Sequence, residues 1–209
     1  MRRSFVPAGL LCLLFVGGTL LRGQNKPLLV EEGRYSIHLL LHKIGTESYT
    51  VTETAPGRLV MMTTSTSSDR GTKRTNDVKL EMGPLYVPAL LEQRSSGSSG
   101  GSVEDESRTE VKGSSVSVLE RGVSRTMRTP PVAFLGFGSM PASLQMMMMR
   151  YWRLHHQPVR LPILRASDKA LPLEIKLVGH DSFSVNGRAS AIRRARPVDS
   201  PLRQECRIA

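Results

Sequence analysis

The chain has little cysteine and few aromatic residues. Only two of its 209 residues are cysteine, and one of them, Cys12, lies inside an apolar N-terminal segment. If that segment is removed, Cys206 has no partner, and an internal disulfide is excluded. Aromatic residues make up 5% of the chain and do not alternate with basic ones, as a surface that stacks nucleic-acid bases requires. We therefore expect neither a disulfide-stapled fold nor a nucleic-acid partner.

Motifs that carry enzyme chemistry are also missing. Gly136-Phe-Gly138 begins like a phosphate-binding loop, but Pro141 stands where the third glycine belongs. The same proline excludes Ser139 from a G-x-S-x-G nucleophile elbow. Glu104-Asp-Glu106 reads as a solvated edge rather than a pair of catalytic carboxylates. We therefore predict that the protein is not an enzyme and has no cofactor.

The five histidines do not form a chelating pattern. His38 and His42 would lie about 13 Å apart along an extended strand, whereas an imidazole–metal bond is about 2 Å long. His155 and His156 are adjacent, and neighbours on a helix point about 100° apart. We expect no metal site.

The formal net charge of +11 is concentrated at the two ends of the chain. Residues 1–23 hold three arginines and no acid, and residues 187–209 hold six arginines against Asp199 and Glu205. The middle of the chain is therefore only weakly basic. A continuous basic surface for a nucleic acid is not indicated.

Residues 1–23 have the features of a secretory signal peptide. Arg2 and Arg3 form a short basic start, residues 10–16 form an apolar core, and Gly23 precedes a suitable cleavage point. An uncleaved N-terminal anchor is the alternative, although the run is short and glycine-broken for a membrane span. We expect a periplasmic or secreted protein that meets a membrane only through this segment, if it stays attached.

Alternating apolar and polar residues predict a mainly β protein. Residues 34–42, 47–53 and 59–65 alternate in this way, and Gly45 and Pro56-Gly57 are the expected turns between them. Three strands joined by short turns imply antiparallel pairing of consecutive strands. The sequence therefore predicts a curved antiparallel sheet or half-barrel.

Weaker strands continue the pattern to residue 190, which suggests one β-rich domain over residues 24–190. Residues 85–91 are expected at a sheet edge, because Pro84 and Pro88 cannot complete a hydrogen-bonded ladder. The Ser/Gly-rich residues 94–102 predict a flexible hairpin loop, with a domain linker as the alternative.

Residues 141–156 contain the one convincing helix. Its apolar residues recur at the i, i+3, i+4 and i+7 spacing of a single helix face: Leu144, Met147, Met148, Tyr151 and Leu154. Ser139 is the expected N-terminal cap, and Pro158 marks the end. We expect this long helix to pack on the concave face of the sheet.

Met146, Met149, Tyr151 and Trp152 are the candidate ligand-binding residues. Flexible thioethers and large rings can line an adaptable apolar pocket. The alternative is that the methionines only fill gaps in the core. Because a helix across a curved sheet leaves an apolar cleft at its edge, we expect exposed apolar area beside Met146, Met149 and Trp152.

Residues 191–209 lack the period of a strand or of a helix. Asn186-Gly187 is the strongest hairpin signal in the chain, and a returning strand should follow it. Arginine and proline follow instead, in Arg193-Arg-Ala-Arg-Pro197. We expect an irregular basic tail, which is either a truncated or frame-shifted end or a disordered segment.

Two stretches carry a family resemblance. Residues 34–49 resemble the opening of periplasmic proteins in which a strand, an Ile-Gly turn and a second strand begin a curved antiparallel sheet. Residues 144–156 and 173–187 are similar to an uncharacterised β-rich domain of secreted bacterial proteins, which sometimes precedes an amidohydrolase domain. The resemblance implies a strand and an aromatic hairpin after Asn-Gly, where this chain has arginine and proline. The amidohydrolase metal ligands are absent from the sequence.

These features lead to one preferred function and one alternative. We expect an exported, non-catalytic binding or accessory module of the cell envelope, which is lipoprotein-carrier-like or lipocalin-like by analogy. Its partner would be a lipid-like or other apolar ligand held beside the Met-rich helix, or an envelope protein. The alternative is a truncated accessory fragment of a secreted hydrolase that is inactive alone.

Overall fold

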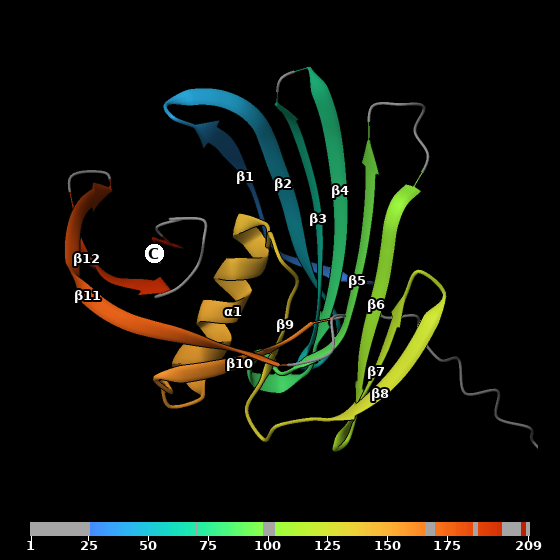
Figure 1. The fold of residues 1–209 in the computed structure, drawn as a ribbon. Coiled ribbons are helices and arrows are strands. Elements are labelled where there is room, and N and C mark those ends of the chain that lie inside the picture. The colour runs from blue at the N-terminus through green and yellow to red at the C-terminus, as the bar shows by residue number, and fades with distance from the viewer. Residues whose placement is uncertain are drawn as a thin grey trace, which may run out of the picture.

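The fold is dominated by one large antiparallel sheet in which consecutive strands are neighbours. The computed structural model describes residues 26–69, 71–97, 103–165, 170–185, 188–197 and 206–207. The eight strands follow one another across the sheet in chain order (Figure 1). They are β1 (Leu28–Leu39), β2 (His42–Ala55), β3 (Arg58–Asp69), β4 (Thr72–Met82), β5 (Pro88–Gly97), β6 (Val103–Lys112), β7 (Ser115–Glu120) and β8 (Val123–Arg128). The predicted meander of antiparallel strands is confirmed.

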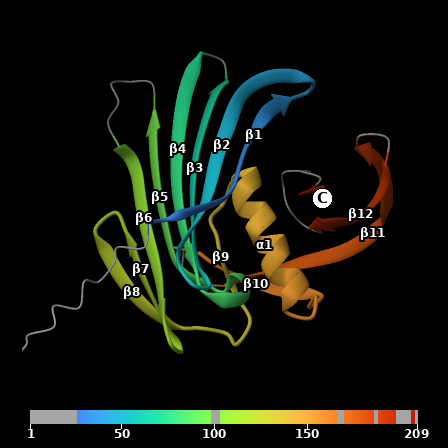
Figure 2. The ribbon, with the colours of Figure 1, turned by 180° about the vertical axis from the view of Figure 1, so that it is seen from behind.

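A smaller sheet lies beside the large one. Its strands are β9 (Phe134–Leu135), β10 (Arg160–Leu164), β11 (Leu171–Val185), β12 (Arg188–Pro197) and β13 (Cys206–Arg207). The spatial order is β13-β12-β11-β10-β9, and the β9–β10 pair is parallel. Seen from behind, β10 passes the end of the helix and leads into the long β11 (Figure 2). The mainly β fold with a curved, unclosed sheet is confirmed, whereas the division into two sheets was not predicted.

The single α-helix of the described residues, α1 (Ala142–Leu154), packs against the concave face of the large sheet (Figure 1). Its predicted apolar face is confirmed for Leu144, Met147, Met148 and Tyr151, which are buried. Leu154 is the exception, because it lies in the last turn and is 48% exposed. The predicted cap is also wrong: Pro141 occupies the N-cap position and no side chain of the helix caps it.

The core lies between α1 and only one end of the concave face. Strand alternation points one set of side chains toward the helix. These inward residues include Val51, Met61, Val78, Leu80, Met82, Leu91, Val116 and Val118, all buried. They pack in one cluster with the helix methionines and with Phe134 and Leu135 of β9. The other end of the same concave face carries a different kind of residue.

The first hairpin turns earlier than predicted. Leu40 and Leu41 connect β1 to β2, and the pair Leu39↔His42 closes the hairpin. Gly45 is not a turn residue, because it lies inside β2 opposite Ser67 of β3. A Cβ atom at Gly45 would come within 2.2 Å of the Thr66 carbonyl oxygen, so the close approach of β3 explains the glycine.

The predicted edge strand after Pro84 is in fact central. Pro84 and Leu85 belong to a short 3₁₀ turn, η1 (Pro84–Tyr86), and β5 pairs with both β4 and β6. Pro88 is tolerated because it is the first residue of the strand. The predicted loop 94–102 is shorter than expected, because β5 continues to Gly97; residues 98–102 lie outside the described residues.

The start of the predicted irregular tail is a strand. β12 includes residues 191–197 and pairs antiparallel with β11, with Val185 opposite Arg188. The backbone ladder therefore forms despite the absence of an apolar alternation. Asn186 and Gly187 themselves, residues 198–205 and residues 208–209 lie outside the described residues, so the expectation of an altered C-terminal end stays a prediction.

Candidate functional site

A cleft of about 1020 Å³ opens on the concave face beyond the N-terminal end of α1. One wall is mainly apolar and comes from β1, β2 and the segment that leads into the helix: Tyr35, Ile37, Leu39, Ile44, Phe137, Met140 and Met146. The floor is polar and comes from β3 to β6: Ser65, Ser67, Asn76, Gln93, Ser95 and Ser107. The cleft therefore offers an apolar side and a hydrogen-bonding side to one ligand.

The polar floor continues the same strand faces that form the core. In β4, the inward residues Leu80 and Val78 are buried, and the next two on that face, Asn76 and Arg74, line the cleft. The change occurs at the level of the helix N-terminus. There the buried hydroxyls of Thr63 and Ser143 are hydrogen-bonded at 2.7 Å. Where α1 stops covering the sheet, the inward residues become polar.

A buried glutamate on β2 holds the N-terminus of α1 at this boundary. The Glu47 side chain accepts hydrogen bonds from the backbone N–H of Ala142 at 2.8 Å and of Ser143 at 2.7 Å. Glu47 is only 2% exposed. Its carboxylate supplies the cap that the helix lacks and lies at the positive end of the helix dipole. Glu47 therefore fixes the point at which α1 stops covering the concave face. Both of its carboxylate oxygens already accept hydrogen bonds from the helix N-terminus.

A second polar cluster fastens the edge strand β1 to the side of α1. The Arg150 guanidinium binds both Glu31 carboxylate oxygens, at 2.6 and 3.1 Å. The Tyr49 hydroxyl donates to the same carboxylate at 2.8 Å. The hydrogen bonds from Arg150 lower the pKa of Glu31 below its usual value, although partial burial opposes them. Burial raises the pKa of the Tyr49 hydroxyl, and the bond to Glu31 raises it further.

This cluster also orients the apolar wall of the cleft. The Tyr35 and Tyr49 rings are stacked, with centroids 5.6 Å apart and an interplanar angle of 13°. The Tyr35 hydroxyl donates to the Met146 sulfur at 3.6 Å. Because Tyr35 and Met146 both line the cleft, the wall is held in place by contacts from β1, β2 and α1.

The cleft lining carries charges of both signs. The Glu47 carboxylate is engaged by the backbone N–H groups of the helix N-terminus. Asp105 pairs with Arg121 at 3.2 Å. Glu120 pairs with Arg125 at 3.3 Å. Arg74 and Arg165 also line the cleft, and neither has an ion-pair partner among the described residues. The Nε–H of Arg165 is buried and has no acceptor in that part of the chain. A guanidinium without an ion-pair partner among the described residues favours an anionic group on a ligand.

Only one of the four predicted ligand-binding residues lies at the cleft. Met146 lines it, but Met149, Tyr151 and Trp152 are buried in the core and are 0%, 2% and 5% exposed. Their polar atoms are satisfied within the fold. The Tyr151 hydroxyl accepts from the Ala133 N–H at 3.1 Å, and the Trp152 indole donates to the Pro158 carbonyl at 2.8 Å. The predicted exposed apolar area beside Met149 and Trp152 is therefore corrected: that part of the helix is sealed.

The residues of the cleft floor could be predicted from the strand pattern of the sequence, but Arg165 could not. Arg74 and Asn76 continue the alternation of Val78 and Leu80, so a strand prediction places all four on one face. Arg165 follows the last residue of β10 and belongs to no periodic pattern. Its approach to the cleft depends on the parallel pairing of β9 and β10, which sequence spacing does not indicate.

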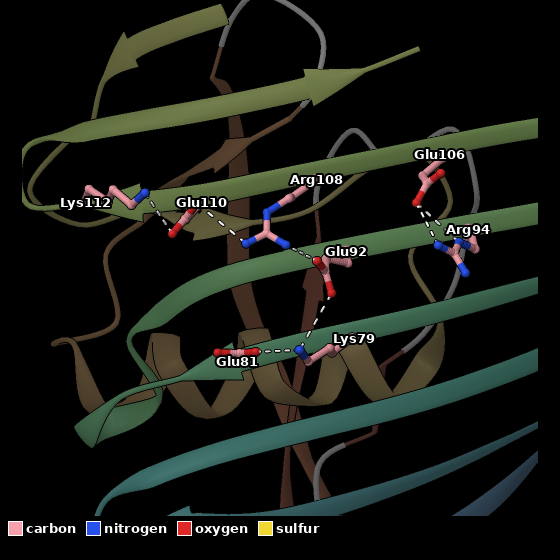
Figure 3. A network of polar contacts seen from close by, with 8 residues as sticks. All are labelled: Lys79, Glu81, Glu92, Arg94, Glu106, Arg108, Glu110 and Lys112. Atoms are coloured by element: carbon pink, nitrogen blue, oxygen red, sulfur yellow. Dashed lines mark hydrogen bonds and ion pairs between the residues drawn. The ribbon is translucent and has the colours of Figure 1, made fainter. Parts of the chain in front are cut away.

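Most other charges of β4, β5 and β6 lie on the convex face. There Lys79, Glu81, Glu92, Arg108, Glu110 and Lys112 form a chain of ion pairs, and Arg94 pairs with Glu106 (Figure 3). These side chains are at least 31% exposed. Exposed pairs of this kind contribute about 0–1 kcal/mol each. The network is a solvated surface, and the two faces of the sheet thus carry separate sets of polar groups.

Histidines do not assemble into a cluster in the described part of the chain. His38 lines the cleft, and His155 lies at the C-terminal end of α1, where its ring contacts Tyr151 at a centroid distance of 4.0 Å. No group of three or more His, Cys, Asp or Glu residues within the described ranges could hold a metal ion. None of the helices among those residues is long and apolar enough to cross a membrane.

Comparison with known proteins adds no relative. No protein-family model, no curated protein and no solved structure matches the chain. The function must therefore be inferred from the cleft itself.

Proposed function

We propose that this protein is an exported, non-catalytic binding module of the cell envelope whose cleft holds an amphiphilic molecule with an acidic group. The observation that carries the proposal is the composition of the cleft. An apolar wall and two guanidinium groups without ion-pair partners among the described residues face one cavity of about 1020 Å³. The proposed ligand site therefore differs from the one predicted from the sequence. It lies in the uncovered half of the concave face rather than beside the sealed part of α1, and it includes polar as well as apolar contacts.

The apolar wall is the reason for proposing that part of the ligand is an acyl chain or a ring. Tyr35, Ile37 and Phe137 present carbon surface to a cavity whose volume lies at the upper end of the range for small-molecule sites. Burial of apolar area is favourable by about 25 cal/mol per Å². The wall is positioned by the stacked tyrosines and by Glu47, so little ordering is required when a ligand binds.

The two arginines of the cleft are the reason for proposing an acidic group on the ligand. A guanidinium binds carboxylate and phosphate through paired hydrogen bonds, which are stronger when the groups are removed from bulk water. Arg165 offers a buried Nε–H that no acceptor among the described residues uses. An acidic group placed there would satisfy this donor through a charge-assisted hydrogen bond, whereas a neutral hydroxyl would form a weaker bond and leave the guanidinium charge unpaired.

The proposal is tested with two fluorescent ligands of equal chain length, a fatty acid and the matching fatty alcohol. The acid should bind the wild-type protein about tenfold more tightly, because one charge-assisted contact is worth about 1.4 kcal/mol or more. Arg165→Gln should remove most of that preference. Arg58→Gln, at an exposed position distant from the cleft lining, should leave it unchanged. Equal binding of acid and alcohol, or binding of neither, would contradict the proposal.

Export rests on the leader-like residues 1–23. The product recovered outside the cytoplasm of a bacterial host should have an intact mass that begins at Gln24. A recovered mass that includes residues 1–23 would instead favour a permanent N-terminal anchor.

A further inference from the structure

The tip of the first hairpin displays two leucines in an unusual backbone conformation. Leu40 and Leu41 are the two connecting residues between β1 and β2, and their side chains are 86% and 95% exposed. Both have a positive φ, +47° and +72°. Two-residue hairpin turns with positive φ at both positions normally use Asn, Asp or Gly. Neither backbone preference nor packing explains leucine at these sites.

The tip stands at the same end of the sheet as the cleft. β1, β3 and β5 all end there, and β2 and β4 begin there (Figure 1). The base of the first hairpin belongs to the cleft itself, because His38, Leu39 and Ile44 line it. The two leucines therefore project beside the cleft mouth, away from the core.

Exposed cations accompany the leucines at this end. Lys43 lies two residues after Leu41 and is exposed, and residues 38–46 contain no acidic residue. Lys73 and Arg74 of β4 are also exposed. The register places Arg74 opposite Ser67 and Ser67 opposite Gly45, so these cations lie two strands away, about 10 Å from the base of the first hairpin. A narrow apolar tip is thus accompanied by positive charge.

We propose that the Leu40–Leu41 tip inserts into the surface of an anionic lipid bilayer. Leucines fit the boundary between headgroups and acyl chains, and nearby lysine and arginine attract anionic headgroups. Two side chains on a hairpin tip offer too little area for a specific protein interface, which buries about 800 Å² on each partner. The inference goes beyond the ligand proposal, because membrane contact at the tip does not require that the cleft bind anything. If both hold, the cleft mouth faces the bilayer.

The test is co-sedimentation of the full chain with vesicles. Wild-type protein should bind phosphatidylcholine vesicles that contain phosphatidylglycerol and should bind pure phosphatidylcholine vesicles at least about tenfold more weakly. Raising the salt concentration from about 0.1 M to about 1 M should weaken the binding, because the Debye length falls from about 10 Å to about 3 Å.

The decisive variant is Leu40→Asn/Leu41→Gly. It installs the residues that this turn geometry prefers, so the hairpin should fold at least as well while the leucines are lost. Binding to the anionic vesicles should fall about tenfold or more. The matched control is Leu85→Ser: Leu85 is also exposed, at 60%, and has a φ of +58°, but it lies in η1 between the other ends of β4 and β5. That control should bind like wild type.

Three results would overturn the inference. The first is failure of the wild-type chain to bind the anionic vesicles. The second is undiminished binding by Leu40→Asn/Leu41→Gly, which would assign the membrane contact to residues 1–23 or to another surface. The third is an equal loss in Leu85→Ser, which would show that exposed leucines in general cause the binding.

Discussion

The two halves of the concave face are built on the same strands and behave differently. Under α1, the inward residues of β3 and β4 are Met61, Val78 and Leu80, and the helix seals them. Beyond the helix N-terminus, the same faces continue as Ser67, Asn76 and Arg74, and a cleft remains open. Alternation alone decides which residues face inward. The position of the N-terminus of α1 along the sheet decides which part of that face is buried core and which part lines the cleft.

The largest effect should separate the two halves within a single strand. Met61 is fully buried under α1, and Ser67 lies on the same face of β3 in the cleft. Met61→Ala should lower the free energy of unfolding by about 2–5 kcal/mol, because it leaves a cavity in the core. Ser67→Ala should change it by less than about 0.5 kcal/mol. Urea unfolding measures both, and equal effects would mean that the two halves are not distinct.

The boundary between the halves should depend on Glu47. Glu47→Gln removes the charge at the helix N-terminus and leaves one amide oxygen for two backbone N–H donors. We expect a loss of about 1–3 kcal/mol in the free energy of unfolding. Glu32→Gln, at an exposed position of β1 outside this contact, is the control and should stay within about 0.5 kcal/mol. Similar losses in both variants would show that Glu47 does not hold the helix N-terminus at the boundary.

The clamp between β1 and α1 should give a smaller, pH-dependent effect. Glu31→Gln should cost about 1 kcal/mol at pH 7, because the paired bonds from Arg150 lose their charged acceptor. The pKa of Glu31 is lower in the folded state than its ordinary value of 4.5. The unfolded chain therefore takes up the proton first as the pH falls. The contribution is complete above pH 4.5 and is lost as the pH falls through the folded-state value.

Unfolding free energies of wild type and Glu31→Gln, measured from pH 7 downward, check this prediction. The two curves should converge in acid. A difference that stays constant with pH would assign the effect of the substitution to packing rather than to ionisation.

The smallest effect should come from the convex face. Glu92 contacts both Lys79 and Arg108 at the centre of the exposed network (Figure 3). Glu92→Gln should change the free energy of unfolding by about 0.5 kcal/mol, and high salt should reduce the difference. Thermal unfolding at two salt concentrations measures it. A loss as large as that of Met61→Ala would mean that the network holds the sheet together.

The sheet and the helix could be predicted because each repeats a local pattern. Tyr49 and Val51 mark the inward face of β2, and the spacing of Leu144, Met147 and Met148 marks the helix face. The first turn could not be located, because Leu40 and Leu41 continue the apolar run and contain no turn residue. The β12 strand was also missed, since an arginine-rich ladder forms through backbone pairing with β11.

The candidate site was harder to predict than the fold. Met146 could be assigned to a cleft beside the helix, but Met149 and Trp152 could not be distinguished from core residues by composition alone. The position of the cleft depends on where the N-terminus of α1 lies along the sheet. The hydrogen bond between Glu47 and Ala142, which are 95 residues apart in the sequence, sets that position. Long-range contacts of this kind leave no periodic trace.

Photo-crosslinking tests most directly whether the open half is the site. A fatty acid with a diazirine near the end of its chain would be bound, irradiated, and located by peptide mass spectrometry. Labelled residues are expected in the apolar wall, within residues 35–39 or 137–146. Labelling confined to Met149–Trp152 would show that the ligand enters the helix-covered half instead, and would contradict the account.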